Sequence, residues 1–213
     1  HCAQLADMDW KCPSSEWTPV EIQTLCSPLT NLTHLKLTFH PIQTPKQETF
    51  VEHVLFNLAT QLMSLQVSAS QLFSLQFPIL ETLKTTVTWQ DIPACMAFLH
   101  RHTMLRHLTL AVQTDRNWEW DFSAIALESL KLDIKTPTAR LRSPPTLRSL
   151  KMPYGARFDN IADIEPHLAL EVFNDEDIPM LKRNRIRNVT LVELAQQYEP
   201  ECVRKERVSI FRV

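Results

Sequence analysis

Two histidines, His100 and His102, lie in a segment with helical spacing, and imidazole groups are frequent zinc ligands. Residues two apart on a helix point in different directions, and no third ligand stands at a recognisable spacing from them. Asp115, Glu119 and Asp121 are acidic neighbours in a predicted loop, without a base or nucleophile motif. We therefore expect no catalytic residue and no metal site.

Glycine is nearly absent from the 213 residues: the chain holds one, Gly155, against 14 prolines. Loops that bind nucleotide phosphates need several glycines at short spacing, because the backbone must approach the phosphate closely. The nucleophile elbow of serine hydrolases also requires glycine. The composition thus excludes phosphate-binding loops and the nucleophile elbow, and we expect neither a cofactor nor enzymatic activity.

A repeated phrase, Leu-x-x-Leu-x-apolar, predicts the elements that position side chains. Its six copies begin at residues 32, 62, 80, 105, 127 and 147, so consecutive copies lie 18 to 30 residues apart. The third copy ends in threonine. The fourth and sixth positions alternate inward along a short strand, while positions three, five and seven point to the other face. Weaker strands are expected within 167–173 and 186–191.

The segments between these strands are return legs of differing kinds. Apolar residues at three- and four-residue spacing predict a helix over 47–61, opened by Pro45, and a second helix over 92–102. The leg over 135–145 is expected to be extended or irregular. A last helix is expected over 191–198. Parallel strands joined by such legs indicate an α/β fold.

The phrases resemble leucine-rich repeats, and more narrowly the irregular repeats of fungal F-box proteins. The resemblance implies a solenoid with parallel strands on a concave face and short helices or irregular legs on a convex face. It implies an N-terminal capping segment over 1–28, repeats over 29–192 that are clear to about 152 and degenerate after it, and a C-terminal cap or tail over 193–213. In that family the F-box recruits a ubiquitin-ligase scaffold and the repeats hold the substrate.

The chain departs from the family pattern in two ways. The ninth repeat position, usually asparagine, reads His40, Ser70, Thr88, Gln113, Lys135 and Gly155. Without an asparagine ladder, we expect a less uniform curvature. No F-box helical bundle fits before Leu32, so the contact with a ligase scaffold would lie in a region outside this chain.

The outward strand positions predict the binding surface. Position five holds four lysines in six copies, and position three holds short polar residues and histidine. Such a row favours an acidic or phosphorylated protein partner, and the lack of interleaved aromatic residues argues against nucleic acid. The alternative is a row that serves solubility only, partly neutralised by Glu81 and Glu128. The candidate partner-binding residues are His34, Lys36, Gln66, Lys84, His107, Thr109, Lys131 and Lys151.

Two tryptophans, Trp118 and Trp120, stand in a predicted loop and could anchor a partner. The alternative is that they fold back over the edge of the core. Both interpretations are compatible with the sequence.

Cysteine usage and hydropathy favour an intracellular protein without a membrane segment. The five cysteines show no Cys-x-x-Cys spacing, and no apolar run approaches the roughly 20 residues that span a bilayer. The leading hypothesis is the substrate-recognition part of an F-box-like ubiquitin-ligase adaptor. The alternatives are a structural subunit of a constitutive nuclear or chromatin-associated complex and an extracellular receptor, which glycosylation at Asn31 or Asn188 would support.

Overall fold

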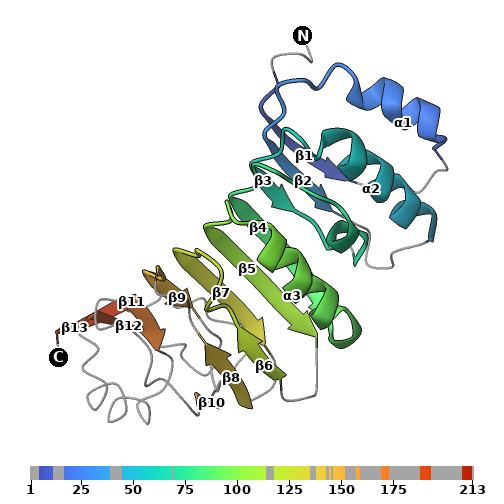
Figure 1. The fold of residues 1–213 in the computed structure, drawn as a ribbon. Helices are drawn as coiled ribbons and strands as arrows, with labels where there is room; N and C mark the ends of the chain where they lie inside the picture. Colours follow the sequence, from blue (N-terminus) through green and yellow to red (C-terminus); the bar gives the residue numbers. More distant parts are fainter. Residues whose placement is uncertain are drawn as a thin grey trace, which may run out of the picture. The chain divides into compact units, whose positions relative to one another are not determined.

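The structure, a computed structural model, is a mixed α/β fold of parallel strands and a few short helices (Figure 1). It divides into two compact units, residues 1–113 and residues 114–213, which are considered separately below. The described residues are 5–11, 17–38, 45–68, 70–113, 118–134, 138–142, 144, 146–151, 157–158, 169–172, 188–192 and 208–212.

The first unit is built on parallel strands that pair in chain order. Their bounds are β1 (Asp7–Lys11), β2 (His34–Thr38), β3 (Ser64–Gln66), β4 (Thr82–Thr88) and β5 (His107–Gln113). The register follows the phrase: Leu35, Leu65, Leu83 and Leu108 lie side by side at its fourth position. The predicted strands and their parallel pairing are therefore confirmed in this unit.

One backbone hydrogen-bond pattern recurs at the start of β2, β3, β4 and β5. The carbonyl of the second phrase residue accepts from two successive N–H groups of the next copy, at 2.8–3.1 Å. The acceptors are Ala6, Thr33, Met63 and Glu81 in the first unit and Glu128 in the second. A backbone carbonyl thus links neighbouring copies and gives two backbone N–H groups the hydrogen-bond partner that they need on burial. This link forms although the ninth phrase position holds no asparagine.

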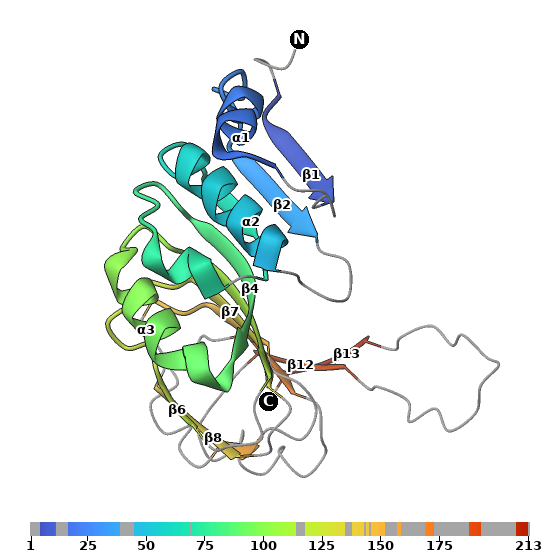
Figure 2. The ribbon, with the colours of Figure 1, turned by 90° about the vertical axis from the view of Figure 1, so that its right-hand side faces the viewer.

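The helices of the first unit lie on one side of its strands (Figure 2). They are α1 (Pro19–Cys26), α2 (Pro45–Leu58) and α3 (Ile92–Arg101), with the short 3-10 helices η2 (Ser70–Ser74) and η3 (Trp89–Asp91). The two predicted helices of this unit are confirmed, with α2 beginning at Pro45 and ending at Leu58. The predicted stripe of α2 is buried: Phe50, Val51, Val54, Leu55 and Leu58.

Helix α1 has a complete N-terminal cap, which explains why it begins at Pro19. The hydroxyl of Thr18 accepts from the N–H of Glu21, and the Glu21 carboxylate accepts from the N–H of Thr18. The N–H and the hydroxyl of Thr18 both donate to the Glu21 carboxylate, and these two hydrogen bonds lower the pKa of Glu21. The helix buries Ile22 and Cys26.

The segment assigned to an N-terminal cap contains an additional copy of the phrase. Leu5-Ala-Asp-Met8-Asp-Trp10 has the same spacing, and β1 pairs with β2 so that Met8 lies opposite Leu35. Methionine and tryptophan replace the aliphatic residues of the other copies, so a search for leucines does not find it. The strand ladder therefore starts one strand earlier than the sequence analysis predicts.

The second unit contains two sheets. In one, β7 (Ser129–Ile134), β9 (Ser149–Lys151), β11 (Ala169–Val172) and β12 (Asn188–Val192) pair in parallel, and β13 (Val208–Arg212) pairs antiparallel with β12. The other holds β6 (Trp118–Asp121), β8 (Thr138–Arg142) and β10 (Arg157–Phe158), also parallel.

Further predictions, beyond the leucine phrases, fall within the second unit. The strands expected within 167–173 and 186–191 are confirmed as β11 and β12, and the leg over 135–145 contains the extended strand β8. The helix expected over 191–198 is wrong at its start, since residues 191 and 192 belong to β12. Residues 193–198 lie outside the described residues.

Candidate functional site

The outward side chains of the first unit form two rows across its strands. Because the strands are in register, phrase position three aligns Asp7, His34, Ser64, Thr82 and His107. Position five aligns Asp9, Lys36, Gln66, Lys84 and Thr109. All of these residues are exposed or half-buried, whereas the inward residues between them on β2 to β5 are buried. We call these two rows the polar strand face.

Six of the eight predicted binding residues thus lie together on the polar strand face: His34, Lys36, Gln66, Lys84, His107 and Thr109. The other two belong to the second unit, where Lys131 lies opposite Lys151 on neighbouring strands. Lys131 is exposed, and the side chain of Lys151 lies outside the described residues. The next strand places Glu171 opposite Lys151, so the lysine row of this unit includes an acidic position.

Strand β1 adds two carboxylates that the sequence analysis does not assign to the face. The Nζ of Lys36 donates to a carboxylate oxygen of Asp9, which lies directly opposite it. An Nδ1–Oδ1 distance of 3.3 Å separates His34 from Asp7. Beside the lysines of the six phrases, neighbouring strands therefore place an acidic residue in each unit, Asp9 on β1 and Glu171 on β11.

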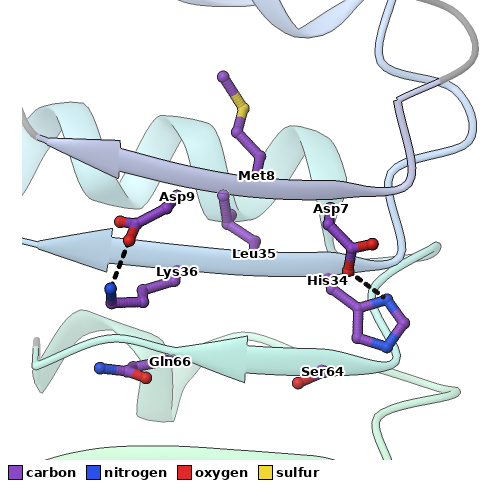
Figure 3. Close-up of a pocket in the computed structure, with 8 residues that line it drawn as sticks. All are labelled: Asp7, Met8, Asp9, His34, Leu35, Lys36, Ser64 and Gln66. Atoms are coloured by element: carbon purple, nitrogen blue, oxygen red, sulfur yellow. Dashed lines mark hydrogen bonds and ion pairs between the residues drawn. The ribbon is translucent and has the colours of Figure 1, made fainter.

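These pairs line an open pocket of about 300 Å³ on the polar strand face (Figure 3). Figure 3 shows the carboxylates of Asp7 and Asp9 on β1 directed toward His34 and Lys36 on β2, with Ser64 and Gln66 on β3 beside them. Met8 and Leu35 complete the lining. The pocket offers both charges and neutral hydrogen-bonding groups, an arrangement suited to recognition of polar side chains.

The two lysines of the polar strand face, Lys36 and Lys84, differ in their surroundings. Lys36 is half-buried and paired with Asp9. Lys84 is exposed, and within the described part of the chain no ion pair involves it. On the polar strand face, Lys84 is therefore the lysine whose charge is available to a partner.

Trp120 does not form the exposed loop anchor that was one interpretation of the sequence. Residues 118–121 are strand β6, and the Trp120 side chain is fully buried, stacked on Phe122 with ring centroids 5.9 Å apart. The alternation Trp118-x-Trp120-x-Phe122 has the two-residue period of a strand, a signal that would have indicated this. The side chain of Trp118 lies outside the described residues.

His102 is buried, and both of its ring nitrogens are occupied. Its Nε2 accepts from the N–H of Phe77 at 2.9 Å, and its Nδ1 donates to the carbonyl of Phe98 at 2.6 Å. Burial lowers the pKa of His102, and the Phe98 carbonyl partly opposes this. The neighbouring His100 is exposed, so the two histidines do not share a site.

The described cysteines are buried free thiols. Burial raises the pKa of Cys26 to about 11, and burial together with the charge of Asp91 raises that of Cys95 to about 12. Since the thiolate is the reactive form, both are poor nucleophiles near neutral pH. Within the described ranges no group of three or more histidine, cysteine or acidic residues could hold a metal ion.

Over the described residues, no helix has the length and apolar character needed to cross a bilayer. In comparisons with known proteins, no family model, no curated protein and no solved structure matches this chain.

Proposed function

We propose that the chain is a leucine-rich repeat solenoid that binds a protein partner on its polar strand face. The observation that carries this proposal is the alignment of polar side chains in two rows on that face, while the helices of the first unit lie on the other side of the strands. The repeated carbonyl hydrogen bonds and the burial of the phrase leucines support the solenoid. The mechanism is positioning, without chemistry at the surface.

The charges of this face favour an acidic or phosphorylated segment of the partner. Lys84 and Lys131 are exposed lysines at equivalent phrase positions, one in each unit, and His107 is exposed next to β4. Lys36 contributes less, because Asp9 neutralises it. Acidic groups of the partner would therefore contact Lys84 in preference to Lys36 on this face.

The wider role follows from the resemblance to F-box proteins with irregular repeats. We propose that the chain is the substrate-recognition part of an intracellular ubiquitin-ligase adaptor, with the scaffold bound elsewhere in the protein. Co-purification of the full-length protein with a ligase scaffold tests this part separately. A constitutive scaffold subunit is the second candidate, but it would bury an apolar face, and the polar rows support it less.

The binding face is tested with charge reversals that leave the core untouched. A partner identified by affinity purification is produced in pure form, and its affinity is measured by titration calorimetry. Lys84→Glu combined with Lys131→Glu should weaken binding by about tenfold or more and leave the thermal midpoint nearly unchanged.

Two controls separate the face from general charge effects. Lys84→Arg with Lys131→Arg keeps the charges and should retain the affinity. Ala94→Glu with Ala97→Glu adds negative charge at exposed positions of α3, on the helix side, and should also retain it. Undiminished binding by the double reversal, or equal loss in the α3 control, would show that the polar strand face is not the binding surface.

A further inference from the structure

Strand β1 leaves one edge of the first unit's sheet uncovered. Among the described residues, β1 pairs with β2 on one side and with no strand on the other. Leu5 is 38% exposed, whereas Leu32, at the equivalent phrase position in the next copy, is 0% exposed. Met8 and Trp10 are half-buried, whereas Leu35 and Leu37 are buried. The layer under β1 is therefore open on one side.

The backbone groups that face this edge can be identified from the neighbouring strands. At phrase position three, the N–H groups of His34 and Thr82 donate to the preceding strand, while that of Val67, at position six, donates to the following one. Because backbone groups of successive residues alternate sides, positions three, five and seven direct theirs to the preceding strand. In β1 these residues are Asp7, Asp9 and Lys11, and their N–H and C=O groups point to the uncovered edge.

The sequence of β1, Asp7-Met-Asp-Trp-Lys11, is complementary to itself in the antiparallel direction. With Asp9 opposite Asp9 of another copy, Asp7 lies opposite Lys11, and Met8 lies opposite Trp10. The edge groups of Asp7, Asp9 and Lys11 then all form hydrogen-bonded pairs of an antiparallel ladder. On the outward face Asp7 meets the oppositely charged Lys11 twice, and the two Asp9 carboxylates lie opposite each other at the centre. On the inward face the apolar Met8 and Trp10 meet.

We propose that two copies of this chain associate through their β1 edges, as an antiparallel strand pair centred on Asp9. The twofold arrangement makes each contact occur twice, as in most homodimers. The two Asp9 carboxylates at its centre are each paired with their own Lys36. The half-buried Met8 and Trp10 gain cover, and Trp10 is already held in place by Phe50, with ring centroids 5.1 Å apart.

An edge strand is covered by an antiparallel strand elsewhere in the chain. In the second unit, the last parallel strand, β12, is covered by the antiparallel strand β13. An antiparallel strand on a parallel edge is therefore compatible with the backbone of these repeats. The dimer does not depend on the proposed partner binding, since it is argued from the edge of β1 and its Asp7–Lys11 pairs and not from Lys84 and Lys131.

The experiment is sedimentation velocity of the whole chain over a range of micromolar concentrations, above neutral pH, with two charge variants. Asp7→Lys places like positive charges opposite each other in the pair, and Lys11→Asp places like negative charges opposite each other. Each variant alone should dimerise at least about tenfold more weakly than the unaltered chain. An equimolar mixture of the two should restore the dimer, because each altered position then faces the opposite charge.

Lys84→Glu, an exposed charge reversal on an interior strand, is the control and should leave the dimer unchanged. Circular dichroism of each variant checks that it remains folded. A chain that stays monomeric throughout overturns the proposal, and so does a dimer that survives both single variants. Failure of the mixture to dimerise, with both variants folded, also overturns it.

Discussion

Lys36 on β2 donates to the carboxylate of Asp9, the residue directly opposite it on β1. The pair lies in the position-five row of the polar strand face and removes one positive charge from it. The side chains of Lys36 and Asp9 are 42% and 55% exposed, so water screens their attraction. The ion pair therefore mainly changes the surface charge that a partner contacts, and it contributes little to the stability of the fold.

Asp9→Asn should release Lys36 while preserving the shape of the side chain. We expect the free energy of unfolding in urea to change by less than about 1 kcal/mol, because exposed ion pairs contribute little. Affinity for an acidic partner should rise, and the gain should shrink with added salt. A loss of stability well beyond this range would mean that the pair holds β1 in place.

The phrase leucines should contribute to stability according to their position in the ladder. Leu80 is fully buried, whereas Leu5, at the same phrase position, is 38% exposed. Leu80→Ala should lower the unfolding free energy by about 2–5 kcal/mol, because it leaves a cavity in a packed core. Leu5→Ala should cost clearly less. Urea unfolding of both variants checks this, and equal losses would contradict the assignment of Leu5 to an open layer.

The strands and helices were predictable where the sequence has a strong period. The leucine phrase predicts β2 to β5, and the apolar stripe predicts α2 almost to its bounds. The leucine phrase does not predict strand β1, because Met8 and Trp10 stand at phrase positions four and six, where aliphatic residues are usual. Phe98 on α3 is also buried, although the apolar spacing of that segment does not identify it.

The candidate site was predictable in part. Alternation along each strand places His34 and Lys36 on the outward face, and the structure confirms this placement. The pairing of Lys36 with Asp9 depends on the register between strands 27 residues apart in sequence, which the alternation does not specify. A prediction of surface charge from the leucine phrases alone therefore omits charges, such as that of Asp9, on neighbouring strands that lack the leucines.

Trp120 should affect stability and not partner binding directly. It is fully buried, and within the described residues its indole nitrogen has no hydrogen-bond partner. Trp120→Ala should cost about 3–5 kcal/mol in unfolding free energy, as is usual for large buried rings. Trp120→Phe should cost less, because it keeps a buried ring and removes the unpaired N–H. If Trp120→Phe binds the partner far more weakly at unchanged stability, Trp120 acts in recognition after all.

Cys26 and Cys95 should resist thiol reagents in the folded chain. Burial raises the pKa of Cys26 from 9.0 to about 11, so its thiolate population falls by about a hundredfold near neutral pH. Labelling with iodoacetamide, followed by mass spectrometry of each peptide, should show both residues reacting at least that much more slowly in the native chain than in urea. Rapid native labelling of Cys95, the more deeply buried thiol, would contradict the packing of α3.

His102 should make the stability of the fold depend on pH. Its neutral form, with the proton on Nδ1, lets Nε2 accept from the Phe77 N–H inside the first unit. Burial lowers the folded-state pKa below the ordinary value of 6.5, and the charge of nearby Arg101 acts in the same direction. The unfolded chain therefore takes up a proton first as the pH falls.

The sign of the effect follows from this order of protonation. The stabilisation is fully present above pH 6.5, decreases as the pH falls below that value, and is lost once the pH passes the folded-state pKa. Urea unfolding of the unaltered chain on both sides of pH 6.5 measures the loss. His102→Gln cannot titrate, so its stability should depend less on pH over this window, whereas His100→Gln, altered at an exposed residue, should keep the full dependence. The same pH dependence in His102→Gln and the unaltered chain would assign the effect to other groups.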